Sequence, residues 1–89
     1  MRREESFFPD QELILVYIAK RLNEAKRIED LFDGHSLDYL VEPDRYRGGV
    51  LFVRELVGAF FYLTEAAARQ GRELLLSAGL KPYEPEEPS

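Results

Sequence analysis

Two segments of this chain are apolar at both odd and even positions, and they constrain the fold more than any other feature. The first is ELILVYIAK at residues 12–20, and the second is AFFYL at residues 59–63. Because neighbouring side chains of a strand point to opposite faces, each segment predicts a strand with apolar side chains on both faces. A sheet that contains these strands needs a cover on each side.

The residues after the first strand predict a helix. In RLNEAKRIEDLFDGH, Asn23 is a suitable N-cap, Glu24 suits the positive end of the helix, and Gly34 is placed to end it. Apolar residues recur at helical spacing along one face. They are Ala25, Ile28, Leu31 and Phe32.

A second helix is predicted between Thr64, which suits an N-cap, and Gly79. Its inner stripe contains Gly71, a residue that costs about 1 kcal/mol of helix propensity relative to alanine. The presence of this glycine predicts a close approach of the helix to the sheet. The other residues of the stripe are Ala67, Leu74, Leu75 and Ala78.

The middle of the chain predicts shorter extended pieces. LDYLVE at residues 37–42 predicts a strand that Pro43 closes, and DRYRGG at residues 44–49 has the composition of a loop. VLFVREL at residues 50–56 predicts another extended piece, which Gly58 interrupts with a bulge or a tight hairpin.

This order of elements favours an α+β fold. We expect a ferredoxin-like split β-α-β two-layer sandwich with an antiparallel sheet, and both helices on one face because the crossovers are right-handed. Residues 1–11 are predicted to form an N-terminal extension and residues 12–81 the domain. Residues 80–83 could add a short edge strand. Residues 82–89, with three prolines and three glutamates, are predicted to be a disordered acidic tail.

With both helices on one side, the other face of the sheet lacks a cover, and exposed apolar surface of this kind usually marks an interface. We therefore predict a homo-oligomer, with a dimer favoured. The alternative is an intramolecular cover formed by Phe7, Phe8 and residues 50–57. The residues predicted for the interface are Ile14, Val16, Ile18, Phe61 and Leu63.

Charge and composition indicate the kind of partner. The formal net charge is -5, from 17 acidic and 12 basic residues, so nucleic acid and anionic membranes are not expected partners. The chain has no cysteine, and no apolar run reaches the about 18 residues that a membrane span requires. We expect a cytoplasmic protein.

Candidate catalytic chemistry is sparse. His35 is the only histidine, and a metal site or general acid–base pair would need further ligands near it. It follows Gly34 and more often serves as a polar residue at a helix end. We therefore predict no catalytic residues, no metal and no cofactor.

The most suggestive local cluster is Arg45 and Arg47 beside Gly48 and Gly49. Two guanidinium groups next to a flexible turn could hold the phosphate or carboxylate of a small anionic ligand. The cluster lacks the context of a phosphate-binding loop between a strand and a helix. A solvated hairpin loop is the alternative.

VYIAKRLNEAKRIEDLFDGHSLDYLVE and VGAFFYLTEAAARQGRELLLSAGL resemble a prokaryotic signal-transducing protein family of unknown function. That family is similar to the PII-like branch of the ferredoxin-like fold. The resemblance covers residues 12–80 and implies a sensing or adaptor role. The nucleotide-binding signature of PII proteins is absent from this sequence, so ATP or 2-oxoglutarate binding is not implied.

These observations favour a non-enzymatic oligomeric module for regulation or binding, which takes an unidentified ligand or protein partner. The alternative is a small enzyme of the dimeric α/β barrel type, with a pocket between stacked sheets. That alternative requires His35, a tyrosine or an arginine to project into the pocket. A structural subunit of a larger assembly is a third possibility.

Overall fold

A computed structural model of the chain describes residues 1–48 and 54–84. A short 3₁₀ turn precedes three strands and two helices. In chain order the elements are η1 (Glu5–Phe7), β1 (Leu13–Ala19), α1 (Leu22–Gly34), β2 (Leu40–Gly48), β3 (Arg54–Thr64) and α2 (Glu65–Ser77).

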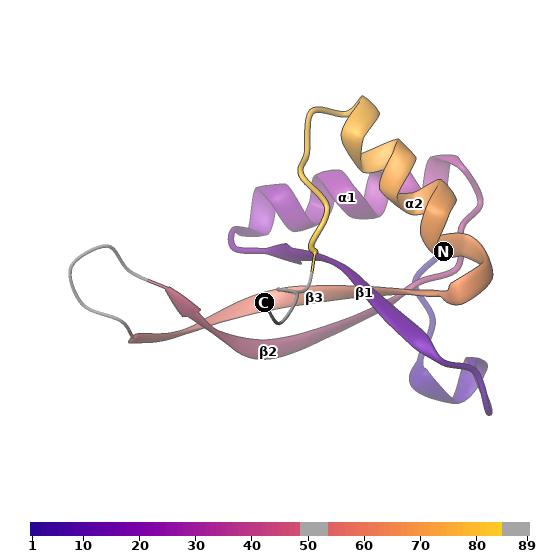
Figure 1. Cartoon of the computed structure of the whole chain (residues 1–89), viewed down its shortest axis with the longest axis horizontal. Helices are drawn as coiled ribbons and strands as arrows, with labels where there is room; N and C mark the ends of the chain where they lie inside the picture. Colours follow the sequence, from indigo (N-terminus) through magenta and orange to yellow (C-terminus); the bar gives the residue numbers. More distant parts are fainter. Residues whose placement is uncertain (49–53, 85–89) are drawn as a thin grey trace, which may run out of the picture.

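The three strands form one antiparallel sheet in the order β1-β3-β2, with β3 in the centre. Both helices lie on one side of this sheet, and the 3₁₀ turn lies on the other side (Figure 1). The prediction of an α+β fold with an antiparallel sheet and two helices is confirmed.

β1 contains an irregularity that changes which side chains face the helices. Its pairing with β3 shifts between Leu15 and Tyr17, so Val16 is an extra residue of a β-bulge. Before the bulge, Ile14 lies on the face of the sheet that the helices cover and packs against the core. After the bulge, Ile18 pairs with Phe60 on the opposite face. The simple alternation expected from the sequence therefore fails at the centre of β1.

The second strand is longer than the sequence suggested. β2 continues through Pro43 to Gly48, so residues 44–48 are part of a strand and not of a loop. Proline lacks the amide that a central strand needs, but β2 is an edge strand and accommodates it. The predicted end of the strand at Pro43 is wrong for this reason.

The predicted break at Gly58 is also wrong, since β3 is continuous from Arg54 to Thr64. Gly58 pairs with Asp44 in regular register. A Cβ atom on Gly58 would lie 3.0 Å from the Ala19 carbonyl oxygen and 3.0 Å from the Ile18 side chain. The glycine thus permits close backbone packing and does not interrupt the strand. Of the extended piece predicted at 50–56, only residues 54–56 fall within the described part of the chain.

The two helices begin differently. Arg21, not Asn23, is the N-cap of α1, and no side chain caps it, although a Glu24 carboxylate oxygen accepts a 3.3 Å hydrogen bond from the Lys20 amide. The N-cap of α2 is Thr64, as predicted, and its hydroxyl accepts a hydrogen bond from the Ala67 amide at 3.3 Å. The α2 helix ends before Gly79, which has a φ of 78°.

The main core lies between the sheet and the two helices. Phe32 of α1 packs edge-on against Phe61 of β3 and against Tyr39, with ring centroids 6.2 Å and 5.5 Å apart. Leu75 of α2 and Leu63 of β3 are fully buried in the same cluster. The helices therefore bury one face of the sheet through aromatic and aliphatic contacts.

The opposite face is partly covered from within the chain. Leu40 and Phe60 are buried there although they lie outside the main core cluster. Phe8, at the end of the 3₁₀ turn on that side of the sheet, is 5% exposed, whereas Phe7 is 47% exposed. The alternative of an intramolecular cover is thus correct for Phe8.

Both outer strands have neighbours from the chain ends. The Tyr83 amide donates a 2.7 Å hydrogen bond to the Val16 carbonyl at the outer edge of β1, and Pro82 is buried. This segment runs past β1 without forming a regular strand (Figure 1). At the outer edge of β2, Arg2 pairs in parallel with Tyr39.

Candidate ligand-binding groove

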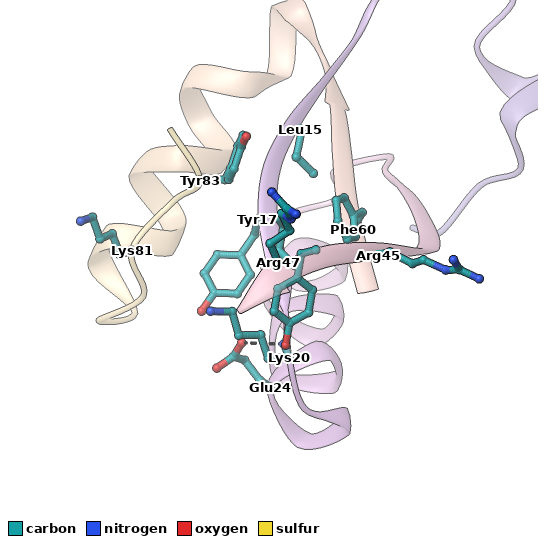
Figure 2. A pocket seen from close by; sticks show the side chains of 11 residues that line it. Leu15, Tyr17, Lys20, Glu24, Arg45, Arg47, Phe60, Lys81 and Tyr83 are labelled. Carbon is teal, nitrogen blue, oxygen red and sulfur yellow. Dashed lines mark hydrogen bonds between the residues drawn. The ribbon is translucent and has the colours of Figure 1, made fainter. Parts of the chain in front are cut away.

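A groove of about 680 Å³ lies along the outer edge of β1, within the size range of small-molecule sites. Side chains from all three strands, the start of α1 and the C-terminal segment line it (Figure 2). We call it the β1-edge groove. Its lining residues are Leu15, Tyr17, Ile18, Lys20, Glu24, Arg45, Tyr46, Arg47, Phe60, Lys81 and Tyr83.

The apolar part of the groove comes from the sheet. Ile18 of β1 and Phe60 of β3 are directly paired, and Leu15 lies on the same face before the bulge. Phe60 is almost fully buried, so it forms a rigid base for whatever occupies the groove. Tyr83, which the hydrogen bond to Val16 holds beside β1, adds an aromatic ring that is 37% exposed.

The groove also gathers basic side chains. Lys20, Arg47 and Lys81 line it, and in the described part of the chain no carboxylate oxygen lies within 4.0 Å of their charged side-chain nitrogen atoms. The Lys20 ammonium lies 5.2 Å from the centre of the Tyr46 ring, a cation–π distance. Their combined charge contrasts with the net charge of -5 of the whole chain.

A single acidic residue, Glu24, enters the groove from the first turn of α1. Burial raises the pKa of the neighbouring Tyr17 above its usual 10.0, and the negative charge of Glu24 raises it further. Tyr17 is therefore a neutral hydroxyl at physiological pH, able to donate or to accept a hydrogen bond.

The predicted anion site is only partly assembled. Arg45 and Arg47 both line the groove, but Arg45 points away from the other labelled side chains in Figure 2. Its guanidinium lies 3.2 Å from a Glu55 carboxylate oxygen. Gly48 is the last residue of β2 and not part of a loop, and Gly49 lies outside the described residues. Arg47 is thus the predicted residue best placed to meet an anion.

Three of the five residues predicted for the oligomer interface lie in the core instead. Val16, Phe61 and Leu63 are fully buried under the helices and offer no surface to a partner. Ile14 is partly buried against the same cluster. Only Ile18 lies on the opposite face, because the bulge at Val16 changes the alternation.

Sequence analysis missed Lys20, Lys81 and Tyr83 as site residues. Lys20 lies just after β1, whereas Lys81 and Tyr83 come after α2, and the fold brings these two segments together. Lys81 and Tyr83 flank Pro82, and this short segment was assigned mainly to the tail. No local motif signals their convergence.

His35 has no place in the groove. It follows α1, where its Nδ1 atom lies 3.0 Å from the Leu31 carbonyl oxygen. Among the described residues, no cluster of three or more potential metal ligands occurs. In the same part of the chain, no helix is both long and apolar enough to cross a bilayer.

No protein-family model, curated protein or solved structure matches this chain significantly.

Proposed function

We propose that this protein is a non-enzymatic binding module that takes up an anionic ligand with an apolar body in the β1-edge groove. The observation that carries the proposal is that Lys20, Arg47 and Lys81 line one groove together with an apolar base and tyrosine rings. Charged hydrogen-bond donors would hold the anion, and stacking on the rings would hold the body of the ligand. The negative charge of the rest of the chain makes this basic groove a selective site for a small anion.

A ferredoxin-like arrangement is our proposal for the complete fold. The order β1-β3-β2, with α1 connecting β1 to β2, supports it because β3 occupies the gap between the two connected strands. The C-terminal segment at the outer edge of β1 occupies the position of the fourth strand in that fold. The sensing or adaptor role implied by the PII-like resemblance remains part of this proposal.

Self-association through the open face of the sheet is a further part of the proposal. Leu13, Leu15 and Tyr62 remain half-buried on that face, and Phe7 is 47% exposed beside it. A second copy packed on these residues would bury them and would lie next to the β1-edge groove. Ligand occupancy could then alter the interface without any chemical step.

An enzyme of the dimeric α/β barrel type has less support. That reading needs polar groups converging in a pocket between two sheets, and His35 lies at the far end of α1. The groove does contain Tyr17, Arg47 and Glu24, so an acid–base pair would have to come from these residues. The raised pKa of Tyr17 makes it a poor base near neutral pH.

Binding can be tested with anilinonaphthalene sulfonate, a fluorescent probe that combines an aromatic body with one anionic group. We expect saturable binding to the folded protein, and about tenfold weaker binding to Arg47→Ala, the effect of losing one charged hydrogen bond. The matched control is Arg69→Ala, which removes the same charge from the outer face of α2, where the side chain is 92% exposed.

Phenylnaphthylamine, the uncharged parent of the probe, should bind more weakly than the sulfonate. Competition by pyrophosphate or by citrate would then separate a phosphate site from a carboxylate site. Equal effects of Arg47→Ala and Arg69→Ala, or equal binding of the two probes, would contradict the proposal. Light scattering over a range of protein concentrations tests the oligomer separately, and a single-subunit mass throughout would contradict that part.

A further inference from the structure

A second groove, of about 690 Å³, lies on the helix side of the sheet, beside α1. Its base is formed by Ala19, Val41 and Ala59, one residue from each strand, and Pro43 continues it along β2. We call it the β2-side groove. It shares only Lys20 with the β1-edge groove.

This groove exists because two helices do not cover the whole face of the sheet. α1 and α2 pack mainly over β1 and β3 and against each other, which leaves the helix-side residues of β2 open. The β2–β3 hairpin also extends past the helices (Figure 1). As a result, Val41 is only half-buried and Pro43 is exposed.

Two large apolar side chains beside the groove are strongly exposed. Leu22, the first residue of α1, is 91% exposed, and Val57 of β3 is 66% exposed. The two residues come from elements far apart in the sequence but line the same groove. Single exposed apolar residues are ordinary on a protein surface, but several around one apolar groove mark an interaction site.

The charged residues of the groove are mostly basic. Arg2, Lys20, Arg21 and Lys26 line it together with one acid, Glu29. Arg2 lies 3.8 Å from Glu29, and Lys26 lies 3.9 Å from Asp30 of the same helix. In the described part of the chain, Lys20 and Arg21 have no such partner. This gives the groove a basic border in a chain of net charge -5.

We infer that the β2-side groove docks an acidic amphipathic helix of a partner protein. A helix placed beside α1 would continue the helical layer over β2 and cover Val41 and Pro43. Its apolar residues, spaced at i, i+3 or i+4, and i+7, would contact Leu22 and Val57. Acidic residues on its flanks would face Lys20 and Arg21, which gives the groove charge complementarity for an acidic partner.

Nucleic acid is a poorer fit, since its phosphates would meet an apolar base and a chain that is acidic overall. The two sites share Lys20 but otherwise depend on different residues, so variants that keep Lys20 test the inference separately from ligand binding in the β1-edge groove.

The test uses a fluorescein-labelled synthetic peptide that is helical, with leucines along one face and glutamates elsewhere. A second peptide has the same leucines with lysines in place of the glutamates. Anisotropy should show saturable binding of the acidic peptide, about tenfold or more weaker binding of the basic one, and affinity that falls as salt rises.

Leu22→Ser and Val57→Ser should each weaken binding of the acidic peptide about tenfold, the range for an anchor that fills a pocket. The control is Leu76→Ser, which changes a leucine that is 62% exposed on α2, outside the groove, and should bind the peptide as wild type does. Because these side chains are exposed, circular dichroism should show the same folded state for all the variants.

Arg47→Ala should leave peptide binding unchanged, and Leu22→Ser should leave binding of anilinonaphthalene sulfonate unchanged. These variants therefore test ligand binding in the β1-edge groove and peptide binding in the β2-side groove separately. Equal binding of the two peptides, or wild-type binding by Leu22→Ser, would overturn the inference. A dimer that reverts to single subunits in Leu22→Ser would instead identify a second copy as the occupant and would also overturn it.

Discussion

A methyl group added to Gly71 of α2 would overlap the side chain of Leu63 on β3. Leu63 is fully buried, so it has no free space into which it could turn. The absence of a side chain at residue 71 therefore sets how closely α2 approaches the sheet. This contact is the close helix–sheet approach that the sequence predicted.

We predict that Gly71→Ala lowers the free energy of unfolding by about 1–3 kcal/mol, the usual cost of overpacking a core. The loss should occur even though alanine favours a helix by about 1 kcal/mol relative to glycine. Urea denaturation measures the difference. Gly34→Ala is the control, because a Cβ atom there meets no atom within 4 Å, and it should be neutral or stabilising. Equal stability of the two variants would contradict the close packing.

The neighbours Leu75 and Leu76 provide a second test of how α2 packs. Leu75 is fully buried, whereas Leu76 is 62% exposed. We expect Leu75→Ala to lower the free energy of unfolding by about 2–5 kcal/mol because it leaves a cavity in the core. Leu76→Ala should change it by less than about 1 kcal/mol. Similar losses in thermal or urea unfolding would mean that the helix is rotated from the orientation described.

Much of the helical part of this fold could be predicted from sequence, because the signals are local. Thr64 supplies a hydroxyl that caps α2, and Gly79 supplies the positive φ that ends it. Gly71 indicated close packing because a glycine lowers the stability of a helix, and a close contact between helix and sheet compensates for that loss. Each of these inferences depends on one residue and its immediate neighbours.

The sheet was predicted less well because its determinants are not local. Whether Pro43 ends a strand depends on whether that strand is at the edge of the sheet, which the strand order decides. The bulge at Val16 has no signature in the sequence, and no local signal showed which face of the sheet the helices cover, so the predicted interface included Phe61 and Leu63 of the core. The basic groove escaped notice for the same reason, since strand pairing alone brings Tyr46 near Lys20.

Tyr39 should make stability fall at alkaline pH. Burial raises its pKa above the usual 10.0, and the hydrogen bond from its hydroxyl to Asp33 Oδ1, at 3.1 Å, raises it further. Below about pH 10 the tyrosine is neutral in both the folded and the unfolded chain, so its stabilising effect is complete. Above that pH the unfolded chain releases this proton first, and stability falls by up to about 1.4 kcal/mol per pH unit.

We predict that, as the pH rises from about 10 to 11.5, the free energy of unfolding decreases less for Tyr39→Phe than for wild type. Urea titrations at each pH measure this difference. At neutral pH the same variant should be about 1 kcal/mol less stable because the hydrogen bond to Asp33 is gone. Phe32→Leu is the control, because it disturbs the ring that packs 5.5 Å from Tyr39 but keeps the hydroxyl. It should retain the wild-type alkaline slope, and a flat slope in wild type would contradict the prediction.

Beyond the bridge between Arg2 and Tyr39, no strand in the described part of the chain pairs with the outer edge of β2, but the charges of this edge oppose pairing with a second copy. Two copies of one strand that pair antiparallel are related by a two-fold axis. Side chains directly opposite each other must point to the same face of the sheet, so this axis passes through one residue position and not between two. Pairing centred on Glu42, Asp44 or Arg45 places that residue opposite its own copy. Pairing centred on Pro43 places Glu42 opposite Asp44, and pairing centred one residue beyond Arg45 places Arg45 opposite Arg47. Each of these registers therefore sets like charges directly opposite each other.

We predict that Pro43→Val combined with Asp44→Thr turns this edge into an interface. The register centred on position 44 then holds no like-charged pair, and residue 43 regains an amide that can donate. Light scattering should give the double variant a larger mass than wild type at equal concentration. Asp44→Thr alone keeps the proline and should keep the wild-type mass. Hydrogen exchange of the wild-type protein provides the opposite test. If wild type dimerises and its β2 amides become protected as the protein concentration rises, the dimer forms at the strand edge. That result would contradict this account, which places self-association of the unaltered chain on the open face of the sheet.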